Sequence, residues 1–583
     1  MYSALNQKSK ENLIYAFEKH GHNPSSNQFA GVLAIPETLT RMLSGTAESK
    51  YYLSSLDPGM GKSTAVISWL LAYLENRINC KQGVLICLER LEEIERYVDE
   101  ANIPEDSYAV IVSEYEERGR ELNQRGVGSD NSTDAIVLFT TKAQIKIRCS
   151  GRDFVSASSL YYRGKPRTIK VWDESFSVGR DVVLNPYDFG KLLAGLGDRD
   201  RNLPTLVSDI ISDIVNCKAG DIYSFPLLPL TRAELLHTIK WKNDTERDLA
   251  DLLGQLSWQP VTIREYKGKQ VVVDCVQAIP DDFLPCLIMD ASGRVKGSYL
   301  LQHKYRKNIV HLTTPDQYKS YRNLTVNVWR RSSSKIALIN DQDEVALELS
   351  KVIAGRPTED FIILCYKSQT NLINAVLKQL PQEDQIRVKL LTWGKHTAVN
   401  TFRDIPNCII ISPYYYRDYH YEALTRAAAM SRTSMGNMSQ EEISRVRKGE
   451  IAHNLLQGCL RGSGRISEGD TCPESRLWLI AAPTTGIEKE LTTIFPDCKV
   501  ETWITENSVL TPHQQKAIDF LLEMNSQGLD EVSAIVVMEH LGIKKACNFK
   551  RGLLDHQTFH AALATIGIRA VKRGKPWNFI RIR

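Results

Sequence analysis

The strongest constraint on the fold is one octapeptide, Asp57-Pro58-Gly59-Met60-Gly61-Lys62-Ser63-Thr64. The apolar run at 51–56 before it predicts a buried strand, and the apolar pattern from Ala65 predicts a helix. A strand, a glycine-bearing loop and a helix N-terminus together direct backbone N–H groups at a phosphate. Lys62 would reach the β- and γ-phosphates of ATP, and Ser63 would ligate Mg²⁺. The residues predicted to bind nucleotide are Pro58, Gly59, Met60, Gly61, Lys62, Ser63 and Thr64.

A pair of acids follows another apolar run further along the chain. The stretch Ile169-Lys170-Val171-Trp172 reads as a strand that ends on Asp173 and Glu174. In ATPases with a phosphate loop, the first acid holds Mg²⁺, here partly through water, and the second orients or deprotonates the attacking water. An acidic pair at a strand end is common by chance, but its combination with the loop at 57–64 is specific to nucleotide-binding proteins. The loop departs from the usual motif at one position, because Leu56 stands where the first glycine is expected.

Apolar runs recur in two series separated by helical patterns. The first series lies at 84–88, 135–139, 168–172 and 286–289, and the second lies at 361–365, 388–391, 408–411 and 477–480. Short apolar runs that alternate with helices are typical of buried parallel strands. We therefore predict an α/β protein with two domains, each built on a mostly parallel sheet.

Length and composition limit the class of protein and its cellular location. A chain of 583 residues allows roughly three or four domains at ~150 residues each. It has no apolar stretch near the roughly 20 residues of a membrane helix, and its first residues do not resemble a secretory signal, so we expect no membrane partner and a cytoplasmic location. The 12 cysteines include no Cys-x-x-Cys pair, which disfavours a zinc or iron–sulfur site.

The order of these motifs resembles the superfamily 2 helicases and translocases of the DEAD/DEAH type over roughly residues 50–490. The resemblance implies two RecA-like P-loop NTPase lobes with nucleotide in the cleft between them. It assigns nucleic-acid contact to Thr140 and Thr141, and coupling between the sites to Asp290, Ala291 and Ser292. It also implies that Gln457, Arg461 and Arg465 face the nucleotide across the cleft. Arg461 and Arg465 lie four residues apart, whereas the two arginines of the family motif lie three apart. Which of them is the arginine finger, the arginine that contacts the γ-phosphate, therefore stays open.

Two further segments flank this core. Residues 178–278 would be an insertion with helices and a β-hairpin that turns at 267–269. Residues 511–583 read as three short helices and a hairpin, the order of a winged helix-turn-helix, with ten Lys or Arg against one acid from 543 onwards. Positive charge of this kind neutralises nucleic-acid phosphates, and aromatic rings can stack on bases. The predicted nucleic-acid contacts are therefore Lys572, Arg573, Lys575 and Trp577.

We therefore expect a 1–40 helical segment, a first lobe at 41–320 that carries the insertion, a second lobe at 321–505 and a winged helix at 511–583. The expected function is an ATP- and Mg²⁺-dependent helicase or translocase on single-stranded or forked DNA, with RNA as an open alternative. Two other functions stay open, a phage terminase-type motor and a DNA-binding regulator or initiator that uses ATP as a switch. The compact architecture also suits a phage or mobile element, by analogy alone.

Overall fold

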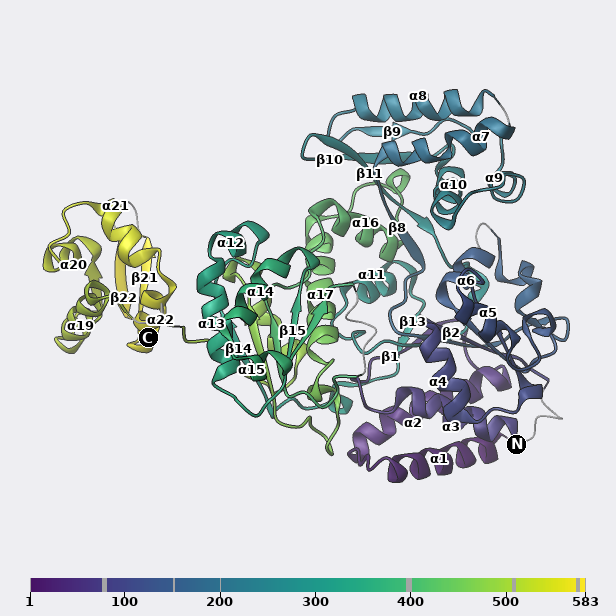
Figure 1. Ribbon diagram of the computed structural model, residues 1–583, viewed down its shortest axis with the longest axis horizontal. Coiled ribbons are helices and arrows are strands. Elements are labelled where there is room, and N and C mark those ends of the chain that lie inside the picture. The colour runs from purple at the N-terminus through teal and green to yellow at the C-terminus, as the bar shows by residue number, and fades with distance from the viewer. Residues whose placement is uncertain are drawn as a thin grey trace.

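Two parallel β-sheets organise the chain, which confirms the mixed α/β class expected from the sequence. The computed structural model describes residues 2–75, 81–149, 152–199, 201–394, 401–505, 510–572 and 577–581. Figure 1 shows the two sheets with their helices as neighbouring bodies, together with one unit above them and one at the far left.

The first sheet has seven strands in the order β13-β1-β12-β7-β2-β4-β3, and every pair in it is parallel. The strands are β1 (Tyr51–Ser54), β2 (Val84–Leu88), β3 (Tyr108–Ile111), β4 (Val137–Thr141), β7 (Ile169–Asp173), β12 (Cys286–Met289) and β13 (Ile309–His311). All residues of β1, β2, β3, β7 and β12 are buried, which explains why β2, β3 and β12 are continuous apolar runs.

Helices cover this sheet and form lobe 1 with it. They are α1 (Tyr2–Lys19), α2 (Ser26–Ser44), α3 (Lys62–Leu74), α4 (Leu91–Ala101), α5 (Glu117–Gln124), α6 (Lys142–Arg148) and α11 (Gly297–Arg306). The first two helices share a core with α3, in which Leu13, Ile35 and Trp69 are fully buried. The N-terminal helices therefore brace the helix that follows the phosphate loop.

The second sheet has six parallel strands in the order β16-β15-β17-β18-β14-β19 and forms lobe 2. The strands are β14 (Leu324–Trp329), β15 (Phe361–Cys365), β16 (Val388–Thr392), β17 (Asn407–Ile410), β18 (Ser475–Ile480) and β19 (Lys499–Thr502). The helices are α12 (Lys335–Asn340), α13 (Gln342–Ala354), α14 (Thr370–Gln379), α15 (Gln382–Ile386), α16 (Asp418–Ala429), α17 (Gln440–Cys459) and α18 (Leu491–Ile494).

The insertion leaves lobe 1 after β7 and returns into β12, the strand beside β7. The two chain crossings lie together, because the carbonyl of Val178 accepts hydrogen bonds from the N–H groups of Ala278 and Ile279. An antiparallel sheet in the order β8-β11-β10-β9 packs with four helices around a core of its own. These elements are β8 (Gly179–Leu184), α7 (Leu193–Arg199), α8 (Leu203–Asn216), β9 (Ile222–Ser224), α9 (Arg232–His237), α10 (Asp244–Leu256), β10 (Pro260–Tyr266) and β11 (Lys269–Gln277).

The sheet of the insertion also rests on α16 of lobe 2. Glu422 of α16 accepts hydrogen bonds from Arg264 of β10 at 2.8 Å and from the fully buried Arg426 at 3.1 Å. Asp274 of β11, also fully buried, accepts from the backbone N–H of Thr433 at 2.8 Å. The insertion is therefore joined covalently to lobe 1 and by buried polar contacts to lobe 2.

The C-terminal unit, yellow in Figure 1, is a helical cluster with a three-stranded antiparallel sheet in the order β20-β22-β21. Its elements are α19 (Pro512–Ser526), β20 (Glu531–Ser533), α20 (Ala534–His540), α21 (Ala546–Phe549), α22 (Gln557–Thr565), β21 (Ile568–Lys572) and β22 (Trp577–Arg581). Phe549, Phe559 and Phe579 meet edge to face in its core. The strand β20 and the helix α21 add two elements to the helices and hairpin expected from the sequence.

Across the described parts of the chain, no helix combines the length and apolar character that crossing a membrane requires.

Candidate nucleotide site between the two lobes

The predicted phosphate loop joins the carboxyl end of β1 to the first turn of α3. Gly59 and Gly61 have positive φ angles of 83° and 90°, a backbone conformation that favours glycine. A Cβ at Gly59 would lie 2.0 Å from the carbonyl oxygen of Arg465 in lobe 2. A Cβ at Gly61 would lie 2.6 Å from the ring of Phe17 in α1. Both glycines are therefore required, and the loop lies against lobe 2 on one side and the N-terminal helix on the other.

The remaining residues of the loop differ in exposure. Met60 is buried, whereas Pro58, Ser63 and Thr64 are half-buried, the last two in the first turn of α3. Lys62 lies back over the loop, because its Nζ donates to the carbonyl oxygens of Leu56 at 2.6 Å and Asp57 at 3.2 Å. Burial lowers the pKa of Lys62, and the nearby carboxylates of Glu174 and Asp173 oppose that shift. The loop lysine and the acidic pair therefore share one site.

The acidic pair ends β7 in an electrostatically unfavourable setting. Burial raises the pKa of Asp173 to about 7, and the charges of Glu174 and Glu93 add to the shift. Glu174 has a φ of 64°, which is uncommon for a residue other than glycine and costs of order 1–3 kcal/mol. Its N–H donates to the carbonyl of Met289 at 3.0 Å, which anchors this backbone to β12. The strained backbone turns the Glu174 side chain towards lobe 2.

Lobe 2 reaches this acid from α17 and the turn that follows it. Gln457 donates from Nε2 to Oε2 of Glu174 at 3.2 Å. Arg461 holds Gln457 in place by donating to its Oε1 at 2.8 Å and to its carbonyl at 3.1 Å. Burial and the neighbouring Arg465 lower the pKa of Arg461 to about 10, and burial also lowers the pKa of Arg465, against the attraction of Glu174. The structure thus brings together, where the two lobes meet, the six residues Lys62, Asp173, Glu174, Gln457, Arg461 and Arg465.

The predicted coupling segment follows β12 and connects the acidic pair to α17. Ser292 donates from Oγ to Asp290 at 2.5 Å and lies 2.6 Å from Nδ1 of His453, one helical turn before Gln457. Burial disfavours the charge of Asp290, but Lys296, His453 and hydrogen bonds from Ser292 and Tyr299 hold its pKa at about 2. Ala291 between them is buried. A continuous polar network therefore runs from lobe 1 to the helix that carries Gln457.

Several residues around the phosphate loop were not among the site residues predicted from the sequence. The fully buried Asp57 accepts hydrogen bonds from Tyr321 Oη at 2.7 Å and Lys319 N at 3.0 Å, and pairs with Arg294 at 2.8 Å. The Nζ of Lys319 also donates to the carbonyl oxygens of Pro58 at 2.9 Å and Arg465 at 2.9 Å. These partners lie more than 200 residues from the loop, so spacing could not reveal them.

Glu93, in the first turn of α4, was also not predicted from the sequence as a residue of this site. Burial and the charge of Glu174 raise its pKa. Burial and the charge of Asp173 likewise raise the pKa of Tyr97, which lies one turn further along α4. The only available signal was the position of Glu93, five residues after a buried strand, at the edge where the carboxyl ends of parallel strands meet.

The predicted nucleic-acid contacts are placed differently from one another. Thr140 is fully buried and donates to the carbonyl of Ile111 at 2.7 Å, so it supports the strand in this structure and its hydroxyl is not presented to a ligand. Thr141 is half-buried at the sheet edge and caps α6. In the C-terminal unit, Lys572 is exposed, whereas Trp577 is half-buried against the unit's own core. Arg573 and Lys575 lie outside the described residues.

No protein-family model matches the sequence, and no curated protein matches it. Solved structures similar to the chain include an XPD helicase, at 12% identity over 81% of this chain and 98% of that chain, with a TM-score of 0.44. Saccharomyces cerevisiae Dbp5 bound to RNA and ADP BeF3 has 10% identity over 84% and 96% of the two chains and a TM-score of 0.37. Mycobacterium smegmatis helicase Lhr bound to ssDNA and AMP-PNP has 11% identity, with 96% of this chain and 60% of that chain covered and a TM-score of 0.32.

Proposed function

We propose that this protein is a nucleic-acid-dependent ATPase that acts as a helicase or translocase on DNA. The observation that carries the proposal is the contact between Gln457 of lobe 2 and Glu174 of lobe 1, directly beside the phosphate loop. When a nucleotide site is formed by two lobes, binding of the γ-phosphate closes the lobes and its loss lets them open. That response is what a stepping motor requires.

The residues of the cleft suit ATP with Mg²⁺. The backbone at Gly59 and Gly61, with its positive φ angles, and the first turn of α3 would present N–H groups to the phosphates. Burial raises the pKa of Asp173 to about 7, and a cation beside this residue would stabilise its carboxylate. Ser63 and Asp173 are the proposed ligands, and Mg²⁺ would neutralise the charge that develops on the phosphates.

Each remaining residue has a role that follows from its position. Glu174 would orient or deprotonate the attacking water, and Gln457 would hold its carboxylate in place. We assign the arginine finger to Arg465, because its backbone touches Gly59 and its charge faces Glu174. Arg461 is engaged with Gln457 and would position it. An arginine in such a place stabilises the transition-state charge on the γ-phosphoryl group.

Nucleic acid would cross the lobes and contact the C-terminal unit. Ten Lys or Arg against one acid between 543 and 583 supply the charge for phosphate contacts. The helices followed by the β21–β22 hairpin support a winged helix in this unit, with Lys572 on the first strand of the wing. We propose DNA as its ligand, with RNA tested beside it.

The first test is steady-state ATPase activity with and without single-stranded DNA or RNA. Stimulation by nucleic acid is expected for the intact chain, with a loss of at least about 100-fold in Lys62→Ala and Glu174→Gln, because each removes a group that acts on the γ-phosphate. The exposed Lys10→Ala and Glu100→Gln are matched controls and should retain the activity. ATP turnover that is indifferent to both nucleic acids would refute the motor, and tight ATP binding without turnover would favour a switch.

A second test removes the C-terminal unit. Deletion of 511–583 should weaken DNA binding and make its salt dependence shallower, because fewer phosphates are neutralised. Basal ATPase activity should persist, because the unit has its own core and contributes none of the cleft residues. An unchanged DNA affinity would argue against this unit as a nucleic-acid grip.

A further inference from the structure

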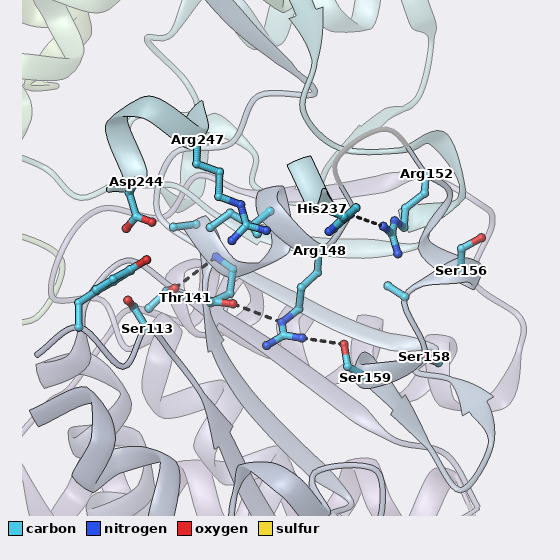
Figure 2. A pocket seen from close by; sticks show the side chains of 15 residues that line it. Ser113, Thr141, Arg148, Arg152, Ser156, Ser158, Ser159, His237, Asp244 and Arg247 are labelled. Carbon is cyan, nitrogen blue, oxygen red and sulfur yellow. Dashed lines mark hydrogen bonds between the residues drawn. The ribbon is translucent and has the colours of Figure 1, made fainter. Parts of the chain in front are cut away.

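A pocket of about 440 Å³ lies between lobe 1 and the insertion. Figure 2 shows its two walls. One wall comes from the end of β4, from α6 and from the segment 152–159, and the other comes from α9 and α10 of the insertion. The pocket therefore lies at the junction of lobe 1 and the insertion, which supplies His237, Asp244 and Arg247 to its lining.

Arginine and histidine side chains enter this pocket from both walls. Arg148 and Arg152 come from lobe 1, and His237 and Arg247 come from the insertion. Within the described residues, no carboxylate forms an ion pair with any of these three guanidinium groups, although Asp244 is also part of the lining. Burial without such a partner lowers the pKa of Arg148. Arg148 and Arg247 are half-buried, whereas Arg152 is exposed, and an anion in the pocket would form charge-assisted hydrogen bonds with these guanidinium groups.

A polar contact joins the two walls, between Nη2 of Arg152 and Nε2 of His237 at 3.3 Å. Arg148 is held in place by Gln144 at 3.3 Å and by the hydroxyl of Ser159 at 2.9 Å, so its guanidinium is oriented before any ligand arrives. The lining also contains hydroxyl groups, including that of Thr141. Guanidinium and hydroxyl donors together are the groups that contact nucleic-acid phosphates and sugars.

An aromatic side chain completes the chemistry. Tyr115 is part of the lining and 73% exposed, a large exposed fraction for an aromatic residue. An aromatic ring beside guanidinium groups is the combination that binds single strands, in which a base stacks while the adjacent phosphates are neutralised. The volume of about 440 Å³ lies within the range of small-ligand pockets.

We propose that this pocket binds the phosphodiester backbone of one nucleic-acid strand, held between lobe 1 and the insertion, with a base stacked on Tyr115. The inference rests on the proposed function, and it adds a contact surface that the insertion supplies. The strand would pass from the edge of the first sheet near Thr141 into the space under α9 and α10.

The test is binding of fluorescein-labelled dT20 to the full-length protein at several salt concentrations, followed by anisotropy. The double variant Arg152→Glu/Arg247→Glu should bind at least about tenfold more weakly, because it loses charge-assisted contacts from both walls. The slope of log affinity against log salt should fall by about 1.4, or about 0.7 for each lost phosphate contact. The matched control is Lys218→Glu, an exposed charge elsewhere on the insertion, which should stay within about twofold of the intact chain.

Two further measurements identify the ligand. Tyr115→Ala should weaken dT20 binding at least about fivefold through lost stacking. Linear polyphosphate, which has no bases, should compete poorly at equal phosphate concentration. If polyphosphate competes equally and Tyr115→Ala is silent, the pocket takes a phosphate chain and the proposal is overturned.

The failures of the two ideas are distinguishable. If the intact chain shows neither dT20 binding nor nucleic-acid-stimulated ATPase activity, the proposed function fails and this inference fails with it. If the intact chain shows both, but the double variant binds like Lys218→Glu, only the pocket inference is refuted.

Discussion

The Asp57 carboxylate offers the sharpest test of how the phosphate loop is held. Its side chain is fully buried and pairs with Arg294 at 2.8 Å, while the Arg294 side chain is 4% exposed. Tyr321 and Lys319 also donate to it, from a segment that leads into lobe 2. Asp57→Asn keeps the shape of the side chain and removes its charge, which leaves the Arg294 guanidinium buried without a counter-ion.

The expected cost follows from that geometry. Removing one partner of a buried ion pair typically destabilises a protein by about 3–5 kcal/mol. Because asparagine can still accept one of the two neutral hydrogen bonds, we expect the lower end, about 3 kcal/mol. For a lobe of this size, 1 kcal/mol shifts the melting temperature by about 2–4 °C, so the transition should fall by about 6–12 °C.

Differential scanning calorimetry of the full-length chain measures this shift. The matched control is Asp470→Asn, which breaks an exposed ion pair with Arg322 that should be worth less than about 1 kcal/mol. Asp57→Asn combined with Arg294→Leu should regain part of the loss, because the unpaired charge is gone. A shift in Asp57→Asn no larger than that of the control would refute the reasoning.

Three further perturbations test other contacts. Gly59→Ala should raise the KM for ATP at least about tenfold in a steady-state assay, because a Cβ would meet the Arg465 carbonyl at 2.0 Å and the positive φ alone costs about 1–2 kcal/mol; an unchanged KM would contradict the close approach. Asp290→Asn should lower the free energy of unfolding by about 2 kcal/mol at pH 7, because a folded pKa of about 2 lies below the usual value of about 3.9; this stability is present above about pH 4 and is lost as the pH falls towards 2, so denaturant titrations that show the same gap at pH 7 and pH 2 would refute it. Glu422→Gln should speed hydrogen exchange in β10 and β11 at least about tenfold, because a fully buried arginine loses its partner, and unchanged exchange would show that apolar contacts suffice there.

Local patterns predicted most of the fold. The runs at 84–88, 286–289 and 361–365 coincide with the observed strands, because strands buried on both faces must be apolar throughout. What the sequence could not give is how the insertion sits on α16, since that contact depends on charges such as Arg264 and Glu422, which lie 158 residues apart.

The candidate site was predictable only where one motif supplies the chemistry. Lys62 and the pair at 173–174 were found because a phosphate loop and an acidic strand end have local signatures. Asp57 and Lys319 were not, because their role depends on burial and on partners from distant segments. Thr140 shows the converse limit: a motif predicted a contact at this strand end, but the alternation of side chains along β4 turned this hydroxyl into the sheet.

The adjacent crossings at Val178 and Ala278 explain how lobe 1 accommodates so large an insertion. Because β7 and β12 are neighbouring strands, the whole insertion is, to the sheet, one loop whose two ends already touch. The entropy of closing such a loop grows only logarithmically, by about 0.6 kcal/mol for each doubling of its length. The stability of lobe 1 therefore depends little on the length or sequence of this loop. The first sheet would tolerate a much longer or shorter segment at the same place.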